Sequence, residues 1–393
     1  MPISPSIWQS FAELTREDLP ILQDIRLAGQ LFTYVNPDGL LTAPTPTPLA
    51  LLLSKLSSLR TLHISEESVE AVLSLGLQWT LLTHLTLKSR HRNSTHASVV
   101  ATIVKSCPSL LSLSLDTTLD HLSPEISDST VVSTVPPQRT NIQSLTLRFQ
   151  EEDRGLWADP SQVLLVTFQG ISTPALEDLT VVMESLITYD DPGSISNSYV
   201  GSHMPFHETL ARSNCRITHL TINDFLLANL EALSRSFELL ESLMSFTYEG
   251  NPYNGKSYIR NQTDRDYLEP FLRLLAEDTS LCPHLERIQV DCEVHHIDHI
   301  IALIAPRHRL KHLTADFGLL PAKGNYEEVS SEQVKAAVAE WRRARGIQVV
   351  WKWRHESIES AGFTDRPCTG IPSAGPDDYS TLWIYTPPRR ECL

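Results

Sequence analysis

The stretch Ser106-Cys-Pro-Ser-Leu-Leu-Ser-Leu-Ser-Leu115 contains the motif that organises this chain. Leu110, Leu113 and Leu115 occupy the first, fourth and sixth positions of an apolar-x-x-apolar-x-apolar motif. Its last four positions alternate, as in a strand with one buried face. The motif recurs in ten copies, which begin at Leu22, Leu59, Leu82, Leu110, Ile142, Leu176, Ile217, Leu243, Leu285 and Leu310. A looser copy begins at Ile347.

Helical patterns lie between these strands. The isoleucines Ile297, Ile300, Ile301 and Ile304 share one helix face, and so do Val334, Ala337, Val338 and Trp341. Ser330 and Gln333 form the expected capping box of the second helix, and Gly346 is expected to end it. Proline, which cannot continue a helix, stands two residues before the motif at Pro20, Pro108, Pro174 and Pro283.

Repeating strand–helix units must stack in order to bury their apolar faces. The interval between copies runs from 23 residues (Leu59 to Leu82) to 42 (Leu243 to Leu285), whereas leucine-rich repeats take about 20–29. We therefore expect an α/β fold over residues 1–353: an irregular leucine-rich-repeat solenoid, with a parallel sheet on one face and helices on the other. Residues 354–393 are expected to form an irregular tail, residues 36–48 an extended proline-rich loop, and residues 1–14 a helix that leads into the first strand. The alternative is an ordinary α/β domain whose strands share a motif.

The repeat phase also predicts which side chains point inward. The core set is Leu62, Leu85, Leu113, Leu145, Leu179 and Leu220. The third and fifth positions point to the opposite, open face. A partner protein is expected to contact mainly these positions, together with two tryptophans: His63, His84, Thr86, Ser112, Ser114, Ser144, Thr146, Thr180, His219, Thr221, Thr247, Trp351 and Trp353. The plainer interpretation is that threonine simply suits a pleated surface.

Composition narrows the classes of function. The net charge of −15 disfavours a nucleic-acid-binding surface. No apolar run approaches the roughly 20 residues of a membrane span. The six cysteines form no C-x-x-C pair, and residues 1–5 do not resemble a secretory signal. We expect an intracellular protein, cytoplasmic or nuclear, with reduced thiols.

One segment matches a nucleotide-binding motif. Residues 250–257 read G-x-x-x-x-G-K-S, the phosphate-loop pattern. Glu249 precedes the first glycine, where it would repel phosphate, and the next helix is expected only near Asp266. We interpret the segment as a turn-rich loop, with nucleotide binding as the alternative.

Other chemical motifs are weak. His295 and His299 have a metal-capable spacing, but they lie opposite the isoleucine face, and structural zinc takes four ligands. The sequence contains no G-x-S-x-G, G-x-G-x-x-G or H-E-x-x-H motif. We therefore predict a protein that is not an enzyme and carries no cofactor or metal.

The segment 341–354 combines three tryptophans with four arginines and one lysine in an acidic chain. It could supply a binding hot spot. Alternatively, its tryptophans could cover the end of the repeat array, as terminal units must.

The Cys-Pro pairs carry a family resemblance. Cys107-Pro108-Ser109-Leu110 and Cys282-Pro283-His284-Leu285 resemble the C-P-x-L signature of F-box/leucine-rich-repeat proteins of the degenerate fungal type. Trp8-x-x-Phe11 also resembles the segment after the F-box in that family. The resemblance covers about residues 5–350. It implies that the repeats recruit a substrate for a ubiquitin ligase, while an F-box binds the ligase adaptor.

The sequence departs from that family in two ways. No F-box precedes the repeats, so adaptor binding is expected only if one lies upstream. The asparagine usual after such strands is mostly replaced: Gln30, Glu67, Arg90, Thr118, Gln150 and Glu184 occupy its place. A non-catalytic protein-interaction scaffold is the first hypothesis. The alternatives are a nucleotide-binding protein and a fragment of a larger receptor.

Overall fold

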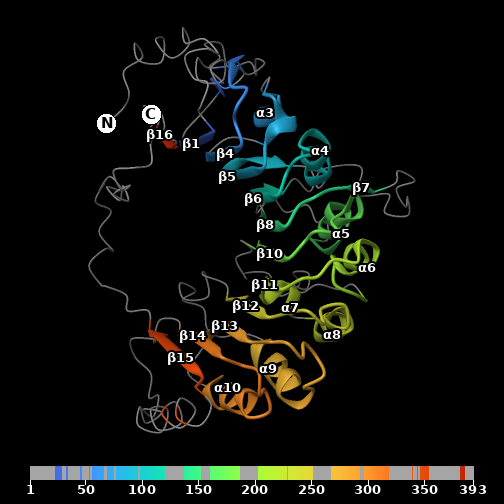
Figure 1. Cartoon of the computed structure of the whole chain (residues 1–393), viewed down its shortest axis with the longest axis vertical. Helices are drawn as coiled ribbons and strands as arrows, with labels where there is room; N and C mark the ends of the chain where they lie inside the picture. The colour runs from blue at the N-terminus through green and yellow to red at the C-terminus, as the bar shows by residue number, and fades with distance from the viewer. Residues whose placement is uncertain are drawn as a thin grey trace, which may run out of the picture.

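The chain forms a large parallel sheet covered by helices on one face (Figure 1). The computed structural model describes residues 23–28, 32–33, 45–46, 53, 55–65, 69–74, 77–95, 98–119, 137–151, 160–185, 202–227, 229–250, 267–292, 296–317, 339, 343, 346–353 and 381–385. The strands of the large sheet are β1 (Asp24–Ala28), β4 (Thr61–Ser65), β5 (His84–Thr95), β6 (Ser112–Leu119), β8 (Ser144–Glu151), β10 (Asp178–Ser185), β11 (His219–Asn223), β12 (Ser245–Glu249), β13 (Arg287–Cys292), β14 (His312–Phe317), β15 (Gln348–Trp353) and β16 (Thr381–Tyr385).

Chain order and spatial order coincide across this 12-stranded sheet, except that β16 lies beside β1. Every pairing in it is parallel. Each of the ten predicted motif copies gives one strand, and each strand begins at the third position of its copy. The predicted α/β fold with a large parallel sheet is therefore confirmed.

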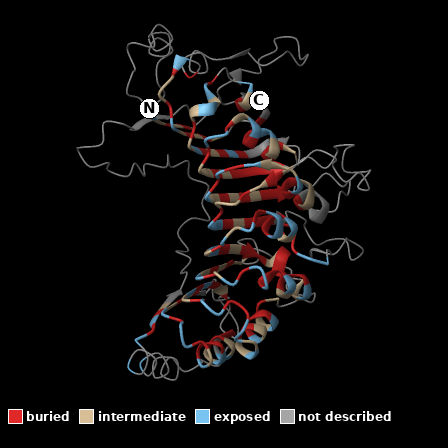
Figure 2. Ribbon diagram, turned by 45° about the vertical axis from the view of Figure 1, so that its right-hand side comes forward, coloured by how far each residue is buried: buried red, intermediate tan, exposed pale blue. Residues whose placement is uncertain are grey.

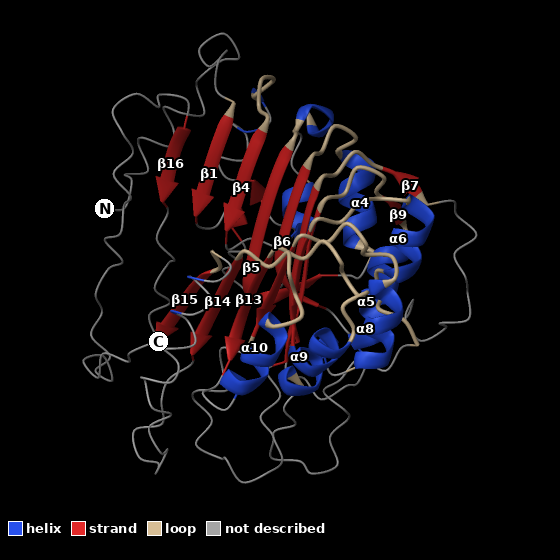
Figure 3. Ribbon diagram, turned by 60° about the horizontal axis from the view of Figure 1, so that its bottom comes forward, coloured by secondary structure: helices blue, strands red, loops and turns tan. Residues whose placement is uncertain are grey.

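The helices return the chain from one strand to the next along the same side of the sheet (Figure 3). They are α3 (Val69–Leu73), the 3-10 helix η1 (Trp79–Leu81), α4 (Val99–Ser106), α5 (Pro160–Gln169), α6 (His207–Ser213), α7 (Asp224–Leu227), α8 (Leu230–Phe237), α9 (Leu268–Glu277) and α10 (Ile297–Ile304). Two small pairs of strands accompany them: β2 (Phe32–Thr33) with β3 (Thr45–Pro46), and β7 (Gln138–Arg139) with β9 (Ile171–Ser172).

The core lies between the sheet and the helices (Figure 2). All six leucines predicted to point inward are at most 1 % exposed. The first motif position is also buried in every described copy. Between α8 and α9, Phe246 of β12 packs against Phe237 and Phe271, with ring centroids 6.4 and 4.8 Å away. Core leucines of this kind each stabilise the fold by about 1.5–3 kcal/mol.

The prolines before the strands have a local explanation. The amide of Leu110 donates to the Cys107 carbonyl over 3.1 Å, and Leu285 donates to Cys282 over the same distance. These bonds close four-residue turns whose second residue is Pro108 or Pro283, the position that proline favours in such turns. The proline therefore sets the turn that leads into the strand.

Two arginines, of which Arg307 is buried, secure helix ends. The Arg212 guanidinium donates to the Ile171 carbonyl over 2.7 Å, just beyond α5. Arg307, only 5 % exposed, donates to four carbonyls at the end of α9 and in the turn that follows it. Cations suit this position because the last carbonyls of a helix lack partners and carry partial negative charge.

Three predicted segments need correction. Residues 381–385 fall in the segment expected to be an irregular tail, yet they form β16 on the edge of β1, where their β-branched and aromatic residues suit a strand. Residues 45–46, expected in an extended proline-rich loop, form β3. Gln348 pairs with His312, so the looser copy is shifted by one residue, and Val349 rather than Val350 is buried.

The expected helix of residues 330–345 lies largely outside the described residues. Gly346, predicted to end it, takes a φ of +65°, the left-handed conformation that glycine accommodates. The expected helix of residues 1–14 also lies outside the described residues.

Candidate functional site

The open face carries two rows of polar side chains in strict register. The third-position row joins Ser112 to Ser144 and Asp178, and the fifth-position row joins Ser114 to Thr146 and Thr180. Because the register does not slip between these strands, the predicted site residues meet on one continuous surface. We call the part of these two rows from β5 to β11, both strands included, the trough.

The structure brings together the eleven predicted strand residues of the site. Nine of them are half-buried: His63, Thr86, Ser112, Ser114, Ser144, Thr146, Thr180, Thr221 and Thr247. His84 and His219 are exposed, and they stand at the two ends of the trough. Apart from Asp178, the floor between them consists of short hydroxyl side chains, so another backbone can approach it closely.

The two predicted tryptophans stand apart from this surface. Trp351 pairs with Ala315 and Trp353 with Phe317, at the β15 edge of the sheet. Ala315 is fully buried and belongs to a core-facing row. Only the backbone of the two tryptophans is described, so their predicted part in binding remains a prediction.

A Thr–His pair repeats at the two ends of the trough. Thr83 Oγ1 lies 2.9 Å from His84 Nδ1, and it also donates to the Arg60 carbonyl over 3.2 Å. Thr218 Oγ1 lies 2.9 Å from His219 Nδ1 and donates to the Glu177 carbonyl over 3.3 Å. His219 Nδ1 is also 2.7 Å from Asp178 Oδ1.

His63 lies on the fifth-position row outside the trough. Its ring contacts Ser65 Oγ over 3.3 Å. Burial lowers the pKa of His63, and the nearby cations Lys88 and Arg26 lower it further, against the opposing effect of Asp24. His63 is therefore mainly neutral near pH 7.

An ion pair that the sequence did not suggest crosses the open face. Both terminal nitrogens of Arg148 on β8 donate to Glu249 on β12, over 2.6 and 2.7 Å. Strands β10 and β11 lie between these two strands. The two side chains therefore reach across two strands, in the two-pronged geometry that arginine forms with carboxylates.

The open-face positions on the two intervening strands are buried. Val182 on β10 is 3 % exposed and Asn223 on β11 is 5 % exposed. The Asn223 side chain donates to the Met183 carbonyl over 2.7 Å and accepts from the Met183 amide over 3.3 Å. The Asn223 side chain thus replaces the backbone hydrogen bonds that a neighbouring strand would give to β10, at the point where β11 ends and α7 begins. The trough is bordered on this side by the ion pair.

The phosphate-loop motif finds little support in its described part. Glu249, before the first glycine, is held by Arg148. A Cβ added at Gly250 would lie 3.2 Å from the Cβ of Asp291. Close packing against β13 therefore gives this glycine a role that needs no phosphate. Residues 251–257 lie outside the described residues.

Three described side chains, Cys107, Cys282 and His299, bear on thiol and metal chemistry. Burial raises the pKa of the Cys107 and Cys282 thiols to about 12, so both stay protonated near neutral pH. His299, expected to face solvent, is half-buried, with its Nε2 3.3 Å from Glu269 of α9. Across the described residues, no group of three or more His, Cys, Asp or Glu side chains could hold a metal ion.

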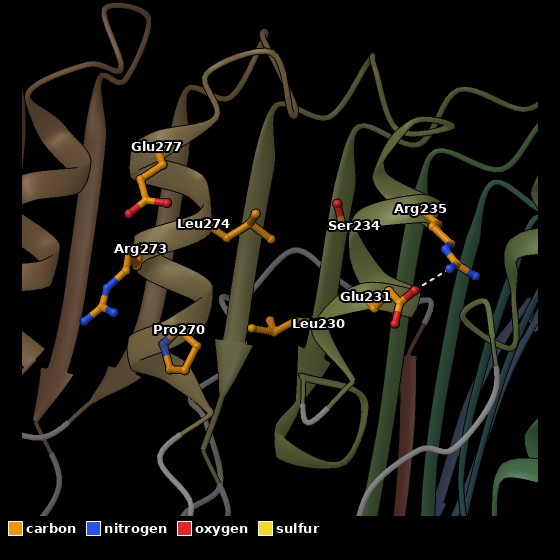
Figure 4. A pocket seen from close by; sticks show the side chains of 8 residues that line it. All are labelled: Leu230, Glu231, Ser234, Arg235, Pro270, Arg273, Leu274 and Glu277. Carbon is orange, nitrogen blue, oxygen red and sulfur yellow. Dashed lines mark hydrogen bonds and ion pairs between the residues drawn. The ribbon is translucent and has the colours of Figure 1, made fainter.

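A separate depression of about 440 Å³ lies between α8 and α9 (Figure 4). Its lining is Leu230, Glu231, Ser234, Arg235, Pro270, Arg273, Leu274 and Glu277. Glu231 pairs with Arg235 along α8, and Arg273 pairs with Glu269 along α9 over 2.6 Å. Such pairs four residues apart are typical of a solvated helix face.

In the described ranges, no helix has the length and apolar character to cross a membrane. Comparison with models of protein families and with curated proteins found no match to this chain.

Proposed function

We propose that this chain is an irregular leucine-rich-repeat solenoid that acts as a non-catalytic scaffold and binds a partner protein on the open face of its sheet. The observation that carries the proposal is the trough: two polar rows in register, floored by half-buried Ser and Thr side chains. Small uniform side chains over several strands leave room for a partner segment. The sequence resemblance to F-box/leucine-rich-repeat proteins supports a substrate-recruiting role in a ubiquitin ligase.

The electrostatics of the trough fit a protein partner better than a nucleic acid. Asp178 is its one charged residue, and it is paired with His219. With a net charge of −15 on the whole chain, a phosphate backbone would be repelled.

The test uses arginine side chains to fill the trough. Thr146→Arg with Thr221→Arg places two long cations on the half-buried floor of the trough. Both threonines point away from the hydrophobic core, so the fold should tolerate the change. The matched control is Thr80→Arg with Thr102→Arg, which adds the same charge at exposed positions on η1 and α4. Circular dichroism should show all three proteins folded.

Proteins captured from an extract are then quantified for the three chains. We expect at least one partner to be retained by the control and reduced tenfold or more by the trough variant. If every captured protein binds all three chains equally, the trough is not the binding surface.

A further inference from the structure

We infer that the trough binds an extended, neutral or basic peptide segment that crosses the strands, and that His84 and His219 hold its two ends as hydrogen-bond acceptors. The inference rests on the proposed function and deepens it by naming the chemistry of the partner.

The hydrogen-bond partners allow us to assign the nitrogen of each histidine that carries the proton. A hydroxyl has one proton to donate. The Arg60 carbonyl can only accept, so we assign the Thr83 proton to it, and the 2.9 Å contact to His84 is then a hydrogen bond from Nδ1–H to Thr83 Oγ1. Nε2 of the neutral ring is then an acceptor.

His219 is held in the same way. Thr218 donates to the Glu177 carbonyl, so His219 Nδ1–H donates to Thr218. Asp178 Oδ1, 2.7 Å from Nδ1, accepts from the same nitrogen. The two ends of the trough therefore carry the same device: an exposed imidazole whose Nε2 is left as the acceptor.

The spacing of the two histidines sets the length of the segment. Four strand spacings separate β5 from β11, because β6, β8 and β10 lie between them. At about 4.8 Å each this is roughly 19 Å, which an extended chain rising about 3.3 Å per residue covers with about six residues. Backbone N–H groups or donor side chains about six residues apart can then meet both Nε2 atoms.

Charge and shape select the same partner. Between the histidines the floor is Ser and Thr apart from Asp178, which is already paired. The net charge of −15 disfavours an acidic segment. At the carboxyl ends of the strands, the Arg148–Glu249 pair runs from β8 to β12 and borders the floor of the trough. This border keeps the bound peptide segment on the third- and fifth-position rows.

The first measurement needs no partner. Long-range ¹H–¹⁵N spectra of the histidine-labelled full chain near pH 8, assigned with single His→Ala variants, report the tautomer of each ring. We expect Nδ1–H for His84 and His219. Nε2–H at both positions would overturn the inference.

The second measurement selects binders from a random-peptide display library on the full chain. We expect selected peptides to lose about tenfold in affinity with His84→Ala and His219→Ala together, the loss expected for about two neutral hydrogen bonds. His84→Gln with His219→Gln places an acceptor oxygen near the position of each Nε2, so this variant should regain part of the lost affinity. His284→Ala with His308→Ala, exposed positions in the turns before β13 and β14, is the matched control.

The variant Thr146→Arg with Thr221→Arg distinguishes a failure of the proposed function from a failure of the histidine anchors. If Thr146→Arg with Thr221→Arg abolishes peptide binding but the histidine pair does not change it, the proposed function stands and the histidine anchors fall. If no selected peptide depends on the trough residues, both are wrong.

Discussion

Arg307 offers the sharpest test of how the units of this fold hold together. Arg307 is 5 % exposed, and its guanidinium donates to the carbonyls of Leu275 (3.0 and 2.7 Å), Asp278 (2.8 Å), Leu281 (2.5 Å) and Cys282 (3.2 Å). It comes from the turn before β14, so it joins one unit of the array to the end of α9 in another. Arg307→Met keeps most of the volume and removes every donor.

The magnitude follows from the carbonyls left behind. The Cys282 carbonyl still accepts from the Leu285 amide over 3.1 Å. Asp278 is half-exposed, so water can replace the arginine there. Leu275 and Leu281 are buried, and each carbonyl left without a donor costs about 1–3 kcal/mol, so the two together are expected to cost about 2–6 kcal/mol. Arg307→Lys should lose nearly as much, because one ammonium group cannot reach all four carbonyls.

The assay is equilibrium unfolding in urea, followed by circular dichroism. Hydrogen exchange over residues 275–285 adds a local readout, because a repeat array can open one unit at a time. The control is Arg309→Met, which removes an exposed arginine that contacts His284 and should change the unfolding free energy by no more than about 0.5 kcal/mol. A loss below 1 kcal/mol for Arg307→Met, or one equal to the control, would refute this account of the helix end.

Four further predictions follow from the sequence and the structure. Leu145→Ala should lower the unfolding free energy by about 2–5 kcal/mol, since its side chain is fully buried, and a loss under 1 kcal/mol would contradict the core assignment. ATP with magnesium should not raise the melting temperature, whereas a nucleotide site at a hundredfold excess over its Kd would add about 2.7 kcal/mol; a rise abolished by Lys256→Ala would reverse this conclusion. Burial and the neighbouring His203 lower the pKa of His207 from its ordinary value of 6.5, so this ring is harder to protonate in the folded state than in the unfolded state. The stability that is present above pH 6.5 is therefore lost as the pH falls. His207→Asn should reduce the fall in melting temperature between pH 7.5 and pH 5.5, and an unchanged fall would contradict the assignment. The 393-residue chain alone should not bind the ubiquitin-ligase adaptor in a pull-down with purified proteins, because no F-box is recognisable in its sequence; capture of the adaptor would reveal a disguised site.

Much of the fold could be read from the sequence because its signal is local and repeated. The apolar spacing of the motif placed the start of ten strands and identified the buried rows, including Leu62 and Leu220. The period of two in a strand then assigned Thr146 and Thr221 to the opposite face. Proline at Pro108 and Pro283 marked turns whose hydrogen bonds the structure shows. Each of these inferences depends on neighbours within one unit.

The last motif copy and the C-terminal segment show where local reading fails. Ile347 matches the first motif position by its apolar character, yet the pairing of Gln348 with His312 shifts the strand by one residue. A run of apolar residues such as Ile347 to Val350 fits either register, so the neighbouring strand decides. Likewise, the five residues of β16 could not be assigned to the β1 edge from sequence, because that edge belongs to the other end of the chain.

By itself, the sequence determined the strand–helix alternation, the parallel sheet, its buried rows and the polar character of its open face. Only the tertiary structure brought Arg148 to Glu249, 101 residues apart, and placed Arg307 at the end of α9. It also showed the Nδ1 partners of His84 and His219, namely Thr83 and Thr218, whose hydroxyls lie within hydrogen-bond distance of the carbonyls just before the neighbouring strands β4 and β10. The physical reason is the range of the interactions: alternation and turns are set by a few adjacent residues, whereas these contacts depend on strand order and register across several units.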